Sequence, residues 1–132
     1  MSTIGHPLSD LANMMTPFYT APLNPAKVQA HKGFLPGATP GLPTPAEIAA
    51  LYFSVVDDKS SAAARDRELQ WAQAFNIFRQ AAICQGIAAR QAARQANSES
   101  ARRYADAREP LAEFAWELVL GVGGGTGSKA KL

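Results

Sequence analysis

The stretch ELQWAQAFNIFRQAAICQGIAARQAARQA, from Glu68 to Ala96, decides the fold class of this chain. It contains no proline, and its apolar residues recur every three to four positions, which predicts one long α-helix. One apolar stripe along this helix is formed by Trp71, Phe75, Phe78, Ala82, Ile83 and Ile87. Ile77 and Ala81 widen the stripe, so we expect the first half of the helix to be buried on more than one side.

Two details of the same helix give further expectations. Gly86 lies mid-helix, where glycine costs roughly 1 kcal/mol relative to alanine, so we expect another helix to approach it closely. Cys84 lies among the apolar residues and is expected to be a core thiol. Residues 88–96 carry arginines and glutamines, so this second half is expected to be more solvated.

The segment after this helix predicts one more helix and a tail. Ser98 is expected to cap a helix that reaches about Leu120, and Pro110 is expected to kink or divide it. The apolar residues that follow the proline at helical spacing are Leu111, Phe114, Ala115, Leu118 and Val119. Residues 121–132 are rich in glycine and are expected to form a disordered tail.

A further helix is predicted before the long one. Thr44 has the character of a cap, Pro45 suits the first helical position, and Glu47 closes a capping box. This helix is expected to end near Asp57. Its apolar stripe consists of Ile48, Leu51, Tyr52 and Val55.

The N-terminal part predicts a short helix followed by a loop. Ser9 or Asp10 is expected to cap the helix, and Pro17 is expected to limit its regular length. Residues 21–45 are rich in proline and glycine, and we interpret them as an ordered loop across the helices, with an interdomain linker as the alternative. Together these elements predict an all-α fold with one domain over residues 1–120.

Composition excludes several classes of function. The chain has 132 residues, of which 47% are hydrophobic and 18% charged, so it is expected to be globular. Its net charge is +2 and its basic residues form no block, so no nucleic-acid partner is expected. No apolar run approaches the ~18 residues of a membrane span, and the N-terminus lacks the pattern of a secretory signal.

No catalytic constellation and no metal site is apparent in the residues. His6 and His31 have no partner at ligand spacing, and Asp57 with Asp58 is interpreted as a solvated helix terminus rather than a cation site. Trp71, Phe75 and Arg79 leave two interpretations open. They form either helix core with a surface arginine, or the wall of a substrate cleft in which the arginine meets an anionic or hydroxylated ligand.

Four segments resemble one family, the aminoglycoside-phosphotransferase-like kinases. Residues 1–12, MSTIGHPLSDLA, resemble the stretch after that family's metal-binding aspartate, where the pattern Gly-(Asp/His)-Pro-Leu-x-Asp-Leu-Ala occurs. Residues 75–90, FNIFRQAAICQGIAAR, are similar to the long C-lobe helix of the branch related to the N-terminal domains of large acyl-CoA dehydrogenases. The loop 36–44 and the ending 110–118 also resemble that branch.

This resemblance implies a truncated C-lobe helical subdomain of a protein-kinase-like phosphotransferase. The family's catalytic base in His-Gly-Asp, its magnesium ligand in Asp-Trp-Glu and its nucleotide lobe have no counterpart in this sequence. ATP and Mg²⁺ are therefore expected only in a full-length relative, and no catalytic residue is assigned here. Asp10 matches the family's Asp-Leu-Ala aspartate, which implies support of the catalytic loop; capping its own helix is the alternative.

Two functional hypotheses follow from the resemblance. The first is a fragment of an ATP-dependent kinase for a small molecule, and the fragment is expected to be inactive alone. The substrate class that the resemblance implies is of the hydroxyacyl-CoA type, in acyl-CoA metabolism. The second is a non-catalytic helical interaction module or pseudo-enzyme remnant that docks on a full-length paralogue. A truncated C-lobe would expose an apolar face, so oligomers or poor solubility are expected.

The last three residues suggest a location. Ala130, Lys131 and Leu132 resemble the Ser-Lys-Leu peroxisomal address, with small, basic and leucine positions kept. The chain is therefore expected in the peroxisome or, if this match is accidental, in the cytoplasm.

Overall fold

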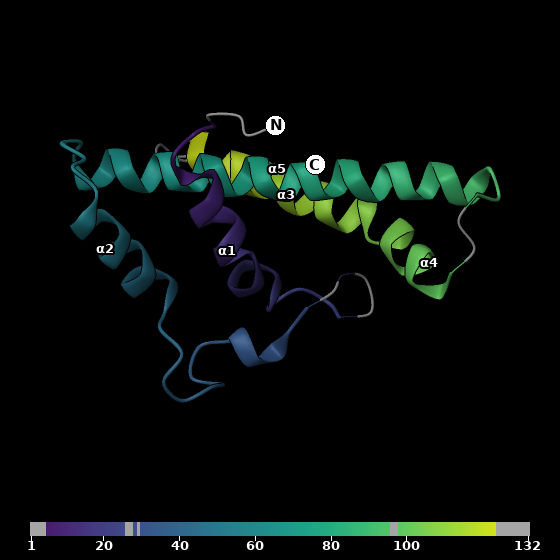
Figure 1. Cartoon of the computed structure of the whole chain (residues 1–132), viewed down its shortest axis with the longest axis horizontal. Coiled ribbons are helices and arrows are strands. Elements are labelled where there is room, and N and C mark those ends of the chain that lie inside the picture. Colours follow the sequence, from purple (N-terminus) through teal and green to yellow (C-terminus); the bar gives the residue numbers. More distant parts are fainter. Residues whose placement is uncertain (1–4, 26–27, 29, 96–97, 124–132) are drawn as a thin grey trace.

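A computed structural model of the chain describes residues 5–25, 28, 30–95 and 98–123 (Figure 1). Within this described part the chain forms helices and loops and no strand, which confirms the all-α prediction. The elements in chain order are α1 (Leu8–Thr20), a 3₁₀ turn (Lys32–Phe34), α2 (Pro45–Val55), α3 (Ala62–Ala92), α4 (Glu99–Asp106) and α5 (Arg108–Gly123).

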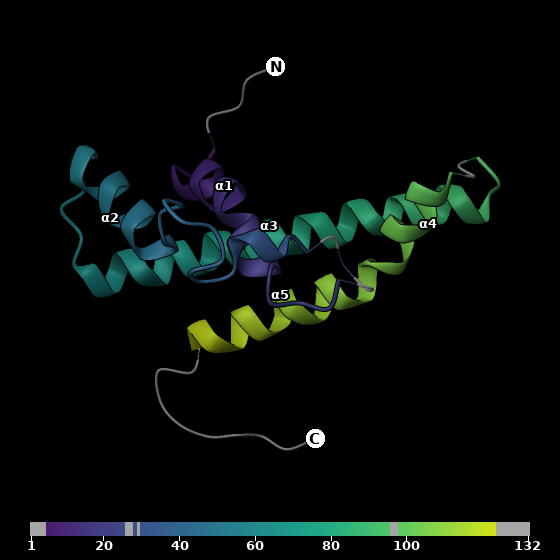
Figure 2. The same cartoon turned by 90° about the horizontal axis from the view of Figure 1, so that it is seen from below.

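The α3 helix spans the length of the molecule, and α5 runs antiparallel along it (Figures 1 and 2). Near one end the Gln70 side chain of α3 lies against α5, because a Cβ atom on Gly121 would be 2.8 Å from Nε2 of Gln70. The main core lies between these two helices. It contains the buried residues Val28, Ile77, Ala81, Cys84, Ala107, Leu111 and Ala115.

The α1 helix covers one flank of α3. It contacts Leu69, Gln73 and Asn76, which share one side of α3. Asn76 lies one position before Ile77, which packs in the core against α5. A step of one residue turns a helix by about 100°, so α1 and α5 occupy adjacent sides of α3. A second core cluster between α1 and α3 consists of Leu8, Leu11, Met15 and Leu69.

The apolar stripe expected to form the core lies largely on the surface. Trp71, Phe75 and Phe78 are 50%, 62% and 59% exposed, and Ile83 is more than half exposed. The expected burial was therefore wrong, whereas Ile77 and Ala81 are buried. The interface is lined mainly by alanines and one isoleucine because helices approach closely only where side chains are small, and indole and phenyl rings would hold them apart.

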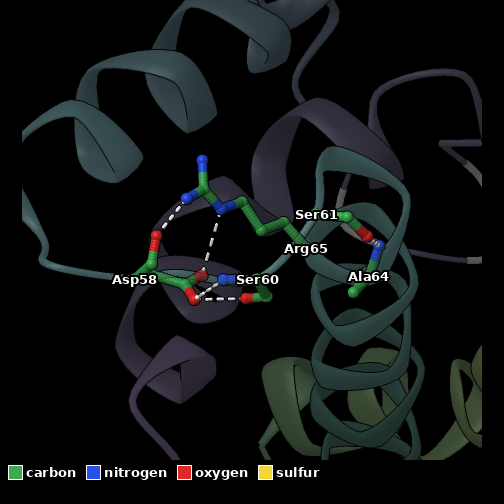
Figure 3. Close-up of polar contacts among 5 residues, drawn as sticks. All are labelled: Asp58, Ser60, Ser61, Ala64 and Arg65. Carbon is green, nitrogen blue, oxygen red and sulfur yellow. Dashed lines mark hydrogen bonds and ion pairs between the residues drawn. The ribbon is translucent and has the colours of Figure 1, made fainter.

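A polar cluster fixes the corner between α2 and α3 (Figure 3). The carboxylate of Asp58 accepts a hydrogen bond from the Ser60 backbone N–H at 2.8 Å and pairs with Nε of Arg65 at 3.2 Å. The Arg65 guanidinium also lies 5.2 Å from the ring centre of Phe53. Asp58 therefore has a structural partner. Ser61 caps α3, which begins at Ala62, six residues before the expected start at Glu68.

In the C-terminal half the predicted cap at Ser98 is present, and the predicted break in the helix lies three residues before Pro110. Ser98 accepts a hydrogen bond from the Ala101 amide and begins α4, as predicted. The division of the predicted helix occurs at Ala107, and Pro110 lies in the first turn of α5, where its missing N–H costs nothing. Helix α5 extends through Gly123, so residues 121–123 are helical rather than part of a disordered tail; residues 124–132 lie outside the described chain.

Two local expectations for α3 and α1 were wrong. No atom lies within 4 Å of a Cβ built on Gly86, so no helix approaches it. Neither Ser9 nor Asp10 caps α1, which begins after Pro7 without a side-chain cap. The helix also continues past Pro17 to Thr20, because packing against α3 outweighs the hydrogen bond that the proline removes.

The segment between α1 and α2 is an ordered loop where the structure describes it, as predicted. Lys32 Nζ donates to the carbonyl oxygens of Ala21 and Leu23 at 3.0 and 3.3 Å. The rings of Phe34 and Phe18 meet edge to face at 5.0 Å. These contacts hold the loop against the end of α1.

The α2 helix is well capped and only partly covered. The predicted capping box is present, with Thr44 N–H donating to Glu47 Oε2 at 2.7 Å. Tyr52 packs toward α1, but Leu51 and Val55 are 68% and 77% exposed, so half of the expected stripe faces away from the core. No helix in the described part is long and apolar enough to cross a membrane.

Candidate functional site

A cavity of about 800 Å³ lies between the C-terminal end of α1, the segment after it, the middle of α3 and the α4–α5 junction. This volume is in the range of small-molecule sites in proteins. The cavity wall carries both apolar and polar side chains. Its apolar residues include Val28, Ile83, Ile87 and Leu111, and its polar residues include Thr16, His31, Gln80, Ser100, Arg103 and Tyr104.

The helix register explains why the cavity forms at this place. Gln80, Ile83 and Ile87 continue the flank of α3 that Leu69, Gln73 and Asn76 begin. The α1 helix covers the first part of this flank and ends at Thr20, so the second part stays uncovered. The α4 helix then closes the far side with Ser100 and Arg103.

The charge of the cavity wall is positive. Among the described residues that line it, Arg103 is the one with a permanent charge, and none is an aspartate or glutamate. No ion pair of Arg103 is found in the described part of the chain. The guanidinium is therefore available to an anionic group in the cavity.

Cys84 contributes its thiol to the cavity wall and to the main core. Burial raises the pKa of this thiol above its ordinary value. A raised pKa keeps the sulfur protonated at neutral pH, which makes it a poor nucleophile. The expectation of a core thiol is confirmed.

The residues singled out from the sequence lie elsewhere. Trp71 and Phe75 project from the exposed side of α3 and do not line the cavity. Arg79 donates from one terminal nitrogen to Oδ1 of Asn13 at 3.1 Å and to Oδ1 of Asn76 at 2.8 Å. In this structure the arginine therefore bridges α1 and α3.

Three further predictions from the sequence concern Asp10, the last three residues and metal binding. Asp10 is exposed in the first turn of α1, where a carboxylate interacts favourably with the helix dipole. Ala130, Lys131 and Leu132 lie outside the described residues. Within residues 5–25, 28, 30–95 and 98–123, no three or more His, Cys, Asp or Glu side chains gather to hold a metal ion.

The cavity residues were missed because they come from four separate segments. Gln80 and Ile87 stand seven positions apart on α3, which is a helical spacing, but their polar and apolar types suggest no common site. Arg103 lies in a helix with several charged residues, and no sequence motif around it indicates a binding site. A second, shallower groove of about 470 Å³ lies on the other side of α4 and includes Arg102 and Asp106.

A scan of protein-family models, a search of curated proteins and a search of solved structures each find no match to this chain.

Proposed function

We propose that this chain is the substrate-side helical part of an ATP-dependent phosphotransferase that acts on a hydroxyl of a small molecule. The observation that supports it is the cavity of about 800 Å³, which combines an apolar wall with hydroxyl, amide and guanidinium groups. Sites of this kind bind and orient small molecules. The resemblance to kinase-like phosphotransferases over residues 1–12 and 75–90 supplies the reaction type.

Phosphoryl transfer needs acceptor binding as well as catalytic groups, and a chain without catalytic groups can supply the acceptor binding. The reaction depends on positioning the acceptor and on stabilising charge with metal ions and a nucleotide cradle. The His-Gly-Asp and Asp-Trp-Glu motifs are not in this sequence. We therefore assign acceptor binding to this chain, and ATP and Mg²⁺ binding to other parts of a full-length relative. A hydroxyacyl-CoA-type acceptor is the proposed substrate class.

The test uses the purified chain and the complete reading frame that contains it. The chain alone is expected to hydrolyse no ATP above a control without protein. The complete product is expected to phosphorylate hydroxy acids, and Ile83→Lys is expected to abolish turnover by placing a long charged side chain in the cavity. Leu51→Lys, on the exposed side of α2, is the matched control. Equal turnover of both variants and the wild type would contradict the proposal.

A second candidate function is favoured by an aromatic face on the α3–α5 pair. We define this face by Trp71, Phe75 and Phe78 of α3 and Trp116 of α5, which is 61% exposed. Phe78 follows Ile77 and Trp116 follows Ala115, both of which lie in the core between α3 and α5, and Trp71 and Phe75 lie at helical spacing from Phe78. A step of one residue turns the side-chain direction by about 100°, and in two antiparallel helices that face each other this turn points toward the same side of the pair. The four rings therefore lie on one side of the α3–α5 pair, opposite the side that α1 covers.

The size of the aromatic face supports an interaction module. A fully buried aromatic side chain removes about 150–250 Å² from water, so four half-exposed rings present roughly 400–600 Å². Patches of this size on single chains often bind a partner. The α1 and α2 helices and the connecting loop all lie on the other side of the pair (Figure 1). We propose docking on a full-length paralogue as the role of this face.

Sedimentation velocity and pull-down with the full-length paralogue test this second candidate. Phe75→Glu with Phe78→Glu is expected to abolish association, whereas Leu51→Glu is expected to leave it unchanged because α2 lies on the other side. A wild-type chain that melts cooperatively as a monodisperse monomer and binds no paralogue would count against it.

We also propose peroxisomal delivery through Ala130, Lys131 and Leu132, with the cytoplasm as the alternative location. A fluorescent protein ending in the last twelve residues of the chain is expected to reach peroxisomes. The same reporter without Leu132 is expected to stay in the cytoplasm. Cytoplasmic fluorescence from both reporters would remove the targeting proposal.

A further inference from the structure

The sign of the charge in the cavity restricts what it can bind. Among the described residues that line it, Arg103 carries a permanent positive charge and none is an aspartate or glutamate. The acidic residue closest in sequence on the same helix, Asp106, lines the groove on the other side of α4. A cationic ligand would leave water without meeting a carboxylate in the described wall, which is unfavourable.

The apolar part of the wall restricts the rest of the ligand. Val28 and Leu111 are buried in the main core and present one surface to the cavity. Ile83 is about half exposed and Ile87 is partly buried, so both still present apolar surface to solvent. A hydrocarbon segment in contact with these side chains would remove that surface from water.

We propose that this cavity binds an amphipathic organic acid, with the carboxylate at Arg103 and a hydrocarbon chain against Ile83, Ile87 and Leu111. Hydroxyl and amide groups of Thr16, Gln80 and Ser100 supply hydrogen bonds between the two ends. This inference rests on the proposed acceptor-binding role of the chain and adds the charge and polarity of the acceptor. It specifies the free hydroxy acid, because a coenzyme A thioester has no carboxylate left to meet Arg103. It excludes polycationic acceptors such as aminoglycosides from this site.

Three probes of equal chain length test the sign of the preferred charge. Hexanoate, hexanol and hexylammonium are titrated into the full 132-residue chain at neutral pH, and amide chemical shifts are followed by NMR. Hexanoate is expected to saturate shifts of residues in the middle of α3 and in α4. Hexanol is expected to bind about five- to tenfold more weakly because it lacks the charge-assisted contact with an exposed guanidinium. Hexylammonium is expected to bind weakest.

Two arginine variants make the assignment specific. Arg103→Gln is expected to weaken hexanoate to the level of hexanol and to leave hexanol unchanged. Arg102→Gln removes the same charge from the neighbouring position, which faces the other groove, and is expected to change neither affinity. Ile87→Ala is expected to weaken hexanoate and hexanol alike, because both use the apolar wall.

The outcomes separate this inference from the proposed function. Hexylammonium binding as well as hexanoate, equal effects of the two arginine variants, or no saturable binding of any probe would overturn the inference. If hexanoate binds as expected while the complete reading frame phosphorylates nothing, the anion site stands and the phosphotransferase proposal falls. Phosphorylation of an aminoglycoside that Ile83→Lys abolishes would keep the function and overturn the inference.

Discussion

Asn76 of α3 donates a hydrogen bond from Nδ2 to Oγ1 of Thr16 on α1, with 2.6 Å between the two atoms. The Asn76 side chain is almost fully buried, and its Oδ1 atom accepts a hydrogen bond from Arg79. Asparagine can satisfy both groups only in one orientation. This bond therefore fixes how α1 lies on α3, and with it the place where α1 ends and the cavity begins.

Asn76→Ala is expected to lower the free energy of unfolding by about 1–3 kcal/mol, because it removes the two hydrogen bonds that this buried side chain makes with Thr16 and Arg79. Urea denaturation followed by circular dichroism measures the change. Asn13→Ala removes the other, exposed acceptor of Arg79 and is expected to change stability by less than about 0.5 kcal/mol. Equal losses in the two variants would show that the buried bond has no special role.

Ile77→Ala and Phe78→Ala are expected to differ sharply although the residues are neighbours. Ile77 is fully buried between α3 and α5, so its truncation should cost about 2–5 kcal/mol. Phe78 is 59% exposed, so its truncation should cost no more than about 1 kcal/mol. Thermal unfolding of both variants decides which side of α3 is the core. A larger loss for Phe78→Ala would contradict the observed packing.

The Asp58 cluster is expected to make stability depend on pH. Hydrogen bonds from Ser60, and to a lesser degree Arg65, hold the pKa of the Asp58 carboxyl below its ordinary value. A lowered pKa stabilises the folded state above the ordinary aspartate range, and this contribution is lost as pH falls through the folded-state pKa. Asp58→Asn is thus expected to be less stable than the wild type at neutral pH.

The difference between Asp58→Asn and the wild type is expected to shrink as the solution is acidified. Unfolding midpoints measured from neutral pH down to about pH 3, below the ordinary aspartate pKa, follow this convergence. Asp57→Asn, at the exposed neighbouring carboxylate, serves as the control. A constant difference across the whole range would mean that the charge of Asp58 does not contribute.

Gly86→Ala is expected to stabilise the chain. Nothing lies within 4 Å of the new Cβ atom, and alanine gains about 0.5–1 kcal/mol over glycine inside a helix. Gly37→Ala is the opposing control, because Gly37 has a φ of +73° that alanine adopts only with strain. The melting temperature should rise for the first variant and fall for the second. A fall for Gly86→Ala would point to a contact that the structure does not show.

Two helix caps, those of α2 and α4, could be predicted from the sequence because they are local. The side chain of Thr44 bonds to the amide of Glu47 three residues away, and Ser98 does the same with Ala101. Such contacts depend only on neighbouring residues, so their residue types identify them. The same holds for the division of the C-terminal helix near Pro110.

The buried side of α3 could not be predicted in the same way. The stripe through Phe75 and Phe78 is more hydrophobic than the one through Ala74 and Ile77, and the two lie only about 100° apart. Hydrophobicity favours the first stripe. The close approach of α5 selects the second, and that approach depends on residues more than thirty positions away along the chain.

The partial covering of α2 has a consequence for how the chain opens. Tyr52 and Phe53 connect this helix to the second core cluster, while Leu51 and Val55 face solvent. Amide protons of α2 are therefore expected to exchange with deuterium through local opening, well before those of α3 and α5. We therefore expect unfolding to begin at α2, with the Asp58–Arg65 pair at the corner between this less protected helix and the more protected α3.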